Sequence, residues 1–247
     1  MFFIPLFSSN LTTNKFGRKI EYLRTVDSTN QEAKRMIDKN YIQSGNIIIS
    51  DEQTNGQGRR GDKWFSSPGK SLTFSLLIKN EDPKLIQKLP LICGISAIKG
   101  IKQLTNCNCT LKWPNDIMYE NSKLGGILIE QTKQHFIIGI GINVNDSTFD
   151  SSIEKEASSL YSILGRPIQR EPLLAFILNN LEQSLHLTLN EIIIKWESYC
   201  AHMNAFIKFH NANEIINAKF LGLNNEGFAN MELNQEHKIF NSGVIQL

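Results

Sequence analysis

The chain of 247 residues has few of the features that mark membrane, secreted or nucleic-acid-binding proteins. None of its apolar runs approaches the roughly 20 residues that a membrane-spanning helix needs. The start, Met1–Phe7, is apolar but has no basic n-region and is too short for a signal-peptide core. The formal net charge is only +2, so no strong field favours nucleic acid or a membrane surface. These deficits favour an ordinary globular protein.

Cysteine and histidine are also too sparse to build a disulfide framework or a metal site. Of Cys93, Cys107, Cys109 and Cys200, only Cys107 and Cys109 are close in sequence, and a single C-x-C without a second pair is a weak metal signal. None of the five histidines has a metal or catalytic-triad spacing. Free or buried thiols in a reducing cytoplasm are therefore the interpretation that fits best.

What the sequence does contain is a glycine-rich stretch, Ser50–Trp64, directly after the apolar run Ile47–Ile49. Its three glycines alternate with polar residues and with the neighbours Arg59 and Arg60. Glycine lets backbone N–H groups approach a ligand closely, and two guanidiniums suit a phosphate or carboxylate. On this stretch alone, a solvated surface turn is an equally good interpretation.

Two familiar nucleotide motifs are excluded by their context. Gly56–Gly61 fits G-x-G-x-x-G, but that fingerprint needs a helix opening at the glycines, and Asp62–Gly69 has the composition of a loop. Pro68–Ser71 ends like a P-loop, yet Trp64 stands where that motif has its first glycine. The segment that follows, Ser71–Lys79, is also typical of a strand rather than a helix.

Hydrophobic patterning predicts an alternation of strands and helices over the first 200 residues. The predicted strands are Tyr22–Val26, Ile47–Ile49, Ser71–Lys79, Ile127–Glu130 and His135–Asn145, with two short ones around the turn in Thr110–Tyr119. The predicted helices are one opened by Asp27–Asn30, an amphipathic one over Pro90–Leu104, one over Glu171–Leu189 and a second that runs to about Tyr199. From Ala205 on, short alternating segments separated by turns predict a small β unit.

The start of the first helix carries residues that could act as a capping box, either Ser28 with Gln31 or Thr29 with Glu32. Capping alone would explain them. A helix N-terminus can in addition bind anions and polar carbonyl groups.

The strand His135–Asn145 has two different faces. One face carries isoleucines and is typical of a core, whereas the other carries Gly139, Gly141 and Asn143. Because glycine weakens a strand interior, two glycines on one face indicate close approach by a ligand or by another backbone. In the preceding hairpin, Asn115 and Asp116 either form the turn only or place a carboxylate where it could hold a divalent cation.

Five segments in order closely resemble the biotin protein ligases. They are Asp27–Asn30, Gly56–Trp64, Lys112–Asp116, Lys123–Ile127 and Gly139–Asn143. The resemblance implies an α/β (α+β) protein with a central mixed β-sheet flanked by helices, related to class II aminoacyl-tRNA synthetases. It implies a biotin- and ATP-binding catalytic domain over residues 1–200 and a small SH3-like β-barrel over residues 201–247.

The resemblance also implies a reaction in two steps, with ATP and Mg²⁺ required and no tightly bound prosthetic group. Biotin and ATP form biotinyl-5'-AMP and pyrophosphate, and a lysine of a biotin carboxyl carrier protein, part of a carboxylase, then takes the biotinyl group. The enzyme would be cytoplasmic, a monomer or a homodimer. The chain begins too close to Asp27 to hold the winged-helix DNA-binding domain of bifunctional relatives, so we expect no DNA binding. The low net charge and the lack of a long apolar run predict no membrane binding.

Residue roles follow from the same resemblance. Lys123, Arg59 and Arg60 are the expected catalytic residues. The expected biotin-binding residues are Ser28, Thr29, Asn30, Gln53, Gly56, Gln57, Gly58, Arg59, Trp64, Lys123, Gly126, Gly139 and Gly141. Those expected to bind ATP or the adenylate are Arg59, Arg60, Lys112, Asn115, Lys123 and Asn143, with Asp116 as a ligand for Mg²⁺.

Two positions depart from the family, which usually has arginine at Gln57 and often at Asp62. These departures put in doubt how tightly the adenylate is held and whether the family's dimer contacts form. Two alternatives stay open: a lipoate or octanoate ligase or transferase of the same superfamily, and a non-catalytic module that senses nucleotide or biotin. The arginine-rich glycine loop disfavours the first, and Lys123 together with Arg59 disfavours the second.

Overall fold

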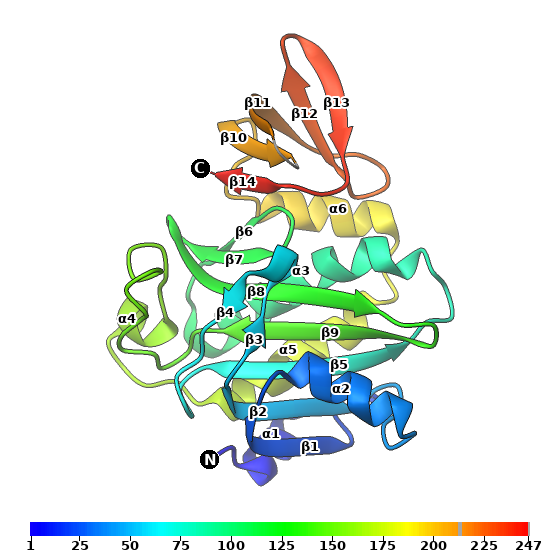
Figure 1. The fold of residues 1–247 in the computed structure, drawn as a ribbon, viewed down its shortest axis with the longest axis vertical. Coiled ribbons are helices and arrows are strands. Elements are labelled where there is room, and N and C mark those ends of the chain that lie inside the picture. The colour runs from blue at the N-terminus through cyan, green and yellow to red at the C-terminus, as the bar shows by residue number, and fades with distance from the viewer. Residues whose placement is uncertain (212–213, 247) are drawn as a thin grey trace.

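The computed structural model describes residues 1–211 and 214–246 and is organised around a mixed seven-stranded sheet (Figure 1). The strand order is β1-β2-β5-β9-β8-β7-β6, with β1 and β2 parallel and all the other neighbours antiparallel. The strands are β1 (Ile20–Val26), β2 (Ile47–Gln53), β5 (Leu72–Lys79), β6 (Thr110–Lys112), β7 (Asp116–Tyr119), β8 (Ser122–Gln131) and β9 (His135–Ile142). The mixed sheet flanked by helices confirms the predicted fold class.

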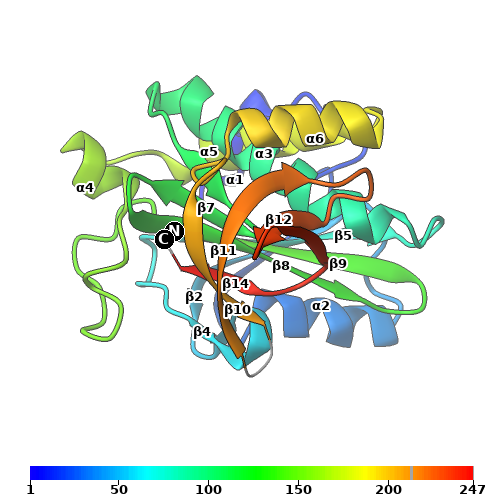
Figure 2. The same cartoon turned by 90° about the horizontal axis from the view of Figure 1, so that it is seen from above.

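Helices cover both faces of this sheet, as the view from above shows (Figure 2). On one side lie α1 (Ile4–Asn10), α3 (Leu85–Thr105), α5 (Arg170–Ser184) and α6 (Leu189–Ser198). On the other side lies α2 (Thr29–Asp38), and the short α4 (Leu160–Leu164) follows the loop after β9. The sheet is therefore the middle layer of three.

The alternation of side chains along the strands divides the hydrophobic core into two parts. The larger part lies under α3 and α5, where Ile138, Ile140 and Ile142 of β9 are buried as predicted. The smaller part lies under α2 and joins Ala33 to Ile137. Beyond Ile137, the same face of β9 carries Gly139 and Gly141, where the side chains of Asn30 and Trp64 lie directly against the strand.

A second sheet of five antiparallel strands ends the chain and confirms the predicted β unit. Its order is β13-β12-β11-β10-β14, with bounds β10 (Phe206–Asn211), β11 (Glu214–Leu223), β12 (Ala229–Leu233), β13 (Glu236–Phe240) and β14 (Val244–Gln246). It sits above α6 and the β6–β7 hairpin (Figure 1). Phe209 and Phe220 belong to the same buried cluster as the large core, so the two sheets share apolar packing. Closure into a barrel and a domain boundary at residue 200 stay predictions.

The glycine-rich stretch is more ordered than its composition predicted. It forms a hairpin of the two-residue strands β3 (Gly56–Gln57) and β4 (Lys63–Trp64), joined by the 3₁₀ turn η1 (Arg59–Gly61). Within the turn, Arg60 has a φ of 55°, a left-handed conformation that is uncommon outside glycine. None of the helices in residues 1–211 and 214–246 is long and apolar enough to cross a membrane.

The predicted capping box at the start of α2 is wrong. Ser28 is the N-cap, but its side chain makes no capping hydrogen bond. The hydroxyl of Thr29 is instead within 3.1 Å of Gln53 Oε1, and Glu32 pairs with Arg35. The sequence pattern for a cap was present, but Gln53 on β2 and Arg35 on α2 are the partners of these side chains instead.

Several predicted boundaries also need correction. The strand after His135 ends at Ile142 rather than Asn145, and β8 begins at Ser122 rather than Ile127. Helix α3 begins at Leu85, five residues before Pro90. The helix predicted over Glu171–Leu189 ends at Ser184, because Thr188 and Glu191 form a capping box that starts α6. Helices α1 and α4 were not predicted, since both are short and lack a long apolar period.

Candidate active site

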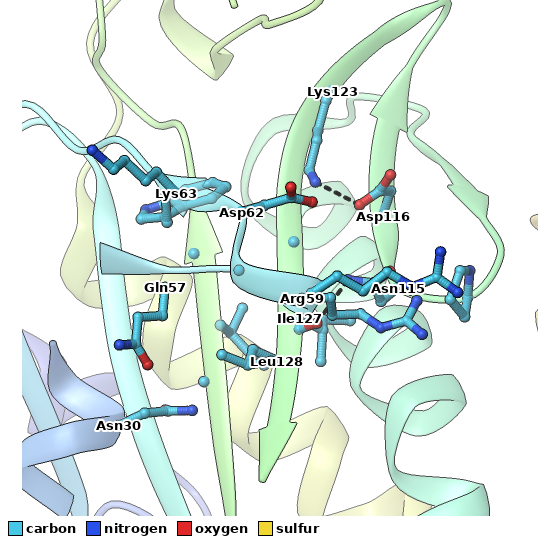
Figure 3. A pocket seen from close by; sticks show the side chains of 18 of the residues that line it. Asn30, Gln57, Arg59, Asp62, Lys63, Asn115, Asp116, Lys123, Ile127 and Leu128 are labelled. Carbon is cyan, nitrogen blue, oxygen red and sulfur yellow. Dashed lines mark hydrogen bonds and ion pairs between the residues drawn. The ribbon is translucent and has the colours of Figure 1, made fainter. Parts of the chain in front are cut away.

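A cavity lies where the β3–β4 hairpin folds over β8 and β9 (Figure 3). Its walls come from the N-terminus of α2, the end of β2, the hairpin, β5, the β6–β7 turn, β8, β9 and the β13–β14 loop. The predicted site residues that line it are Ser28, Thr29, Asn30, Gln53, Gln57, Gly58, Arg59, Arg60, Trp64, Lys112, Asn115, Asp116, Lys123, Gly126, Gly139 and Gly141. Segments far apart in sequence are thus brought to one place.

One end of the cavity is neutral and rich in hydrogen-bonding groups. Gln53, the last residue of β2, accepts a bond from the backbone N–H of Thr29 at 2.8 Å. Ser75 of β5 contacts both Thr29 Oγ1 (2.7 Å) and Asn30 Oδ1 (2.6 Å). Thr29, Asn30 and Ser75 are almost entirely buried. Such a fixed set of polar groups suits a small polar head group rather than bulk water.

The other end of the cavity is cationic. Five basic side chains and two carboxylates line the cavity as a whole, and both carboxylates lie at this end. Asp116 holds Lys123 Nζ at 2.6 Å and Lys112 Nζ at 3.3 Å. Arg59 donates to Asn115 Oδ1 at 3.2 Å (Figure 3). The excess of positive charge suits a phosphate-containing ligand.

Arg59 is a partly buried cation at this end of the cavity. Burial lowers the pKa of its guanidinium, and the like charge of Arg60 lowers this pKa further. Its one side-chain hydrogen-bond acceptor in the described structure is the neutral amide oxygen of Asn115. A partly desolvated cation that contacts no carboxylate gains from an incoming anion, which makes Arg59 a strong candidate for a phosphate contact.

Trp64 covers the space between the two ends. A Cβ placed on Gly141 would lie 2.5 Å from Cε2 of Trp64, and one on Gly126 would lie 3.8 Å from the same ring. At Gly139, a Cβ would lie 2.6 Å from Asn30 Oδ1. The two glycines of β9 are therefore needed because side chains from α2 and the hairpin lie directly on the sheet, whereas a Cβ at Gly126 would make only ordinary contacts. The indole Nε1 of Trp64 is buried without a hydrogen-bond partner.

The backbone of Lys123 pairs with β7 and is also hydrogen-bonded to the loop that follows β9. Its N–H donates to Glu156 O at 2.6 Å, and its carbonyl accepts from Ser158 N at 2.9 Å. Asn143 supports the same loop, since its Nδ2 donates to Ser158 O at 3.0 Å. Asn143 does not line the cavity, and neither does Gly56, which pairs with Trp64 in the hairpin. Their expected ligand contacts stay predictions.

Asp116 was expected to hold Mg²⁺. Magnesium in nucleotide sites uses one or two carboxylates together with phosphate oxygens. Both oxygens of Asp116 are engaged by lysines, and no group of three potential metal ligands occurs among residues 1–211 and 214–246. The side chains as arranged do not form a resident metal site, and the role of Mg²⁺ stays a prediction tied to bound ATP.

The sequence did not reveal that Gly243, Val244 and Ile245 line the cavity. These residues belong to the C-terminal sheet, which the sequence presented as a separate unit. Nothing in their local pattern indicates a site, because they reach the cavity only through the packing of one sheet above the other (Figure 1).

Comparison with known proteins agrees with this geometry. Residues 22–143 match the model of the Biotin/lipoate A/B protein ligase family. The bifunctional ligase/repressor BirA of Bacillus subtilis is 30% identical over 96% of this chain and 76% of its own length. The biotin protein ligase from Aquifex aeolicus, solved in complex with biotin and ATP, is 32% identical, with a TM-score of 0.81 over 93% of this chain and 98% of that one. The biotin--[acetyl-CoA-carboxylase] ligase of Mycobacterium tuberculosis is 25% identical over 67% of this chain and 63% of its own length.

Fold and cavity together define a ligase that joins a carboxylic acid to a protein through a nucleotide. The extent of similarity to the Bacillus and Aquifex proteins is more specific than that. The chain belongs to the biotin protein ligases.

Proposed function

We propose that the chain activates biotin with ATP as biotinyl-5'-AMP and transfers the biotinyl group to a lysine of a biotin carboxyl carrier protein. The observation that carries this proposal is the cavity with one neutral, amide-rich end and one cationic end. A head group held at the neutral end would direct its carboxylate toward Arg59 and Lys123 (Figure 3). The Aquifex relative, solved with biotin and ATP together, supports the pairing of these two substrates.

In the first step, a carboxylate oxygen of biotin attacks the α-phosphorus of ATP, and the bond to the β-phosphate breaks to release pyrophosphate. Two anions must approach each other, and negative charge gathers around phosphorus. Preorganised cations reduce this cost because they are already in place when the charge develops. We assign this role to Arg59, Arg60 and Lys123, which line the cavity, and the 2.6 Å contact of Asp116 with Lys123 Nζ supports an orienting role for this carboxylate.

In the second step, the amine of a carrier lysine attacks the acyl carbon of the adenylate. The carbon–nitrogen bond forms, the bond to the phosphate oxygen breaks, and AMP leaves with its negative charge. The amine must be neutral to attack, so a nearby carboxylate that can take its proton is useful. Asp116 is the carboxylate among the predicted site residues, and it lies beside Lys123.

The carrier is proposed to be the biotin carboxyl carrier protein of a carboxylase. The Mycobacterium tuberculosis relative, named for the acetyl-CoA carboxylase that it modifies, supports this choice. We also propose a cytoplasmic location, supported by the four cysteines, which are free thiols in the described structure. Whether the protein is a monomer or a homodimer, and the absence of DNA binding, stay predictions.

The test is intact mass spectrometry of a biotin carboxyl carrier domain after incubation with this protein, biotin and MgATP. We expect a mass increase equal to one biotinyl group, dependent on both biotin and ATP. Lipoate replaces biotin in a parallel sample, and a carrier domain whose target lysine is changed to alanine is the control for the site of modification. A lipoyl adduct without a biotinyl adduct would overturn the proposal.

A further inference from the structure

The neutral end of the cavity is connected to a charged pair that lies behind it. Asn30 donates from Nδ2 to Glu130 Oε2 at 2.9 Å, and Lys34 Nζ holds the other oxygen, Oε1, at 2.6 Å. Asn30 and Lys34 lie one turn apart on α2, so that both face Glu130 on β8. Neither Lys34 nor Glu130 lines the cavity. Both carry charge next to a buried polar cluster.

The charge of Glu130 settles the orientation of the Asn30 amide. A carboxylate can only accept hydrogen bonds, so the atom of Asn30 that faces it must be the NH₂ group. Asn30 Oδ1 therefore faces Ser75 Oγ, 2.6 Å away. An uncharged residue with both donors and acceptors at position 130 would not impose this orientation.

The orientation of Asn30 in turn sets the direction of the next hydrogen bonds. Ser75 has a single hydroxyl proton, and the carbonyl oxygen of Asn30 requires it. The hydroxyl oxygen of Thr29 lies 2.7 Å from that of Ser75 and 3.1 Å from Gln53 Oε1, so the single hydroxyl proton of Thr29 serves these two acceptors. The hydroxyl of Thr29 then offers only lone pairs to the cavity.

From these contacts we propose that Glu130, held by Lys34, is a positioning residue that makes the Thr29 hydroxyl in this wall of the cavity a hydrogen-bond acceptor. The ligand chemistry that such a wall recognises is a group with N–H donors and no need for a hydroxyl donor, as in a cyclic urea. The inference rests on the proposed function, because the ring of biotin is a cyclic urea with two N–H groups. A dithiolane ring has no N–H donor and gains nothing from this wall.

The decisive variant is Glu130→Gln, which keeps the shape of the side chain but lets the Asn30 amide turn over. We expect the Kd for biotin, measured by calorimetry, to rise about tenfold, the effect of one lost charge-assisted contact. The KM for biotin should rise with it, while the KM for ATP and kcat stay within about twofold, within the scatter expected of sites that do not interact. A residue that only supported the fold would change these parameters together.

Two further variants separate orientation from charge and from folding. Lys34→Gln leaves the carboxylate of Glu130 in place, so it should weaken biotin binding less than Glu130→Gln does. Ser75→Ala cuts the connection between Asn30 and Thr29, and in this background Glu130→Gln should add little further loss. The matched control is Glu52→Gln, a carboxylate that accepts from Thr25 Oγ1 at 3.1 Å and does not line the cavity.

Desthiobiotin keeps the cyclic urea and lacks the sulfur. The substitution Glu130→Gln should therefore weaken the binding of desthiobiotin by the same factor as that of biotin. Wild-type affinity for biotin in Glu130→Gln would overturn the inference, and so would wild-type affinity in Ser75→Ala if Glu130→Gln fails to fold. Failure of the proposed function is a different result, because the unaltered protein would then neither bind biotin nor modify the carrier.

Discussion

The indole ring of Trp64 lies directly on Gly141, so closely that a Cβ at this glycine would be 2.5 Å from the ring. Two elements meet here: a two-residue strand of a surface hairpin and the second glycine of β9. The contact makes Trp64 the cover of the cavity and Gly141 part of its floor. Substitution at either residue therefore tests whether the space between them receives the ligand.

Gly141→Val is expected to abolish biotin binding and leave the protein folded. The branched side chain would push Trp64 off the sheet and fill the cavity, whereas valine itself is well suited to a strand. The neighbouring core residues Ile140 and Ile142 point to the other face and keep their packing. Calorimetry measures the affinity, and circular dichroism checks the fold. Normal biotin affinity in a folded variant would show that the ligand does not use this floor.

Lys123→Ala is expected to slow adenylate formation more than any other single substitution in the cavity. Removing one preorganised charged contact costs roughly 3–4 kcal/mol in the transition state, or a rate loss on the order of 10²–10³. Biotin-dependent exchange of pyrophosphate into ATP measures this step. The matched control is Lys133→Ala, an exposed lysine at the far end of the same hairpin. Near-normal exchange in Lys123→Ala would remove this residue from the chemistry.

The hairpin Asn55–Trp64 is expected to resist protease only when ligand is bound. It contributes few buried apolar side chains. Besides the packing of Trp64 on Gly141, the side-chain hydrogen bonds Gln31 to Gln57 and Arg59 to Asn115 hold it to α2 and the sheet. Trypsin can cut at Arg59, Arg60 and Lys63, and biotin with ATP should slow these cuts several-fold. Unchanged cleavage at saturating ligand would mean that the hairpin does not close over it.

Gln57→Arg is expected to slow the release of biotinyl-adenylate, by about tenfold if the added charged contact contributes roughly 1.4 kcal/mol. In the structure, Gln57 Oε1 accepts from Gln31 Nε2 at 2.9 Å, and arginine cannot accept this bond. Gln31→Ala is therefore the control that removes the same contact without adding charge. The rate at which labelled adenylate is released is measured for both variants. Equal rates for wild type and Gln57→Arg would mean that residue 57 does not contribute to binding the adenylate.

Stability is expected to depend on pH through His202, which is buried between α6 and the C-terminal sheet. Burial lowers its pKa from 6.5 to about 4, and the charge of Lys112 acts in the same direction. Between these values the unfolded chain binds the proton and the folded one does not, so stability falls as the pH drops from about 6.5 to about 4. The full loss is about 3 kcal/mol.

Urea unfolding at pH 7 and at pH 4.5 measures this loss. His202→Phe keeps a ring beside Phe220 and removes the titrating group, so its unfolding free energy should change less between the two pH values. An identical change in both proteins would assign the pH dependence to other groups.

Strand β9 is an element that could be predicted from the sequence alone. Its isoleucines repeat every second residue, and its glycines fall on the opposite face, so a buried strand with an open face followed from pattern alone. The same reasoning predicted the β6–β7 hairpin and the C-terminal sheet. Short elements such as α1 and α4 were not predictable, because one or two turns carry no clear period and depend on what they pack against.

The residue types of the candidate site could be recognised in the sequence, but which of them contact one another was decided by the tertiary structure. The glycines and the adjacent arginines can be recognised in the sequence because backbone freedom and charge are properties of the residues themselves. The capping pattern at Ser28 and Thr29 was present in sequence, yet Gln53 and Ser75 on neighbouring strands took the partners that a cap would have used. Likewise, Glu130 reaches Asn30, and Gly243 reaches the cavity, only after strands distant in sequence are packed together. Hydrogen-bond geometry acts over about 3 Å, and that proximity is decided by the fold.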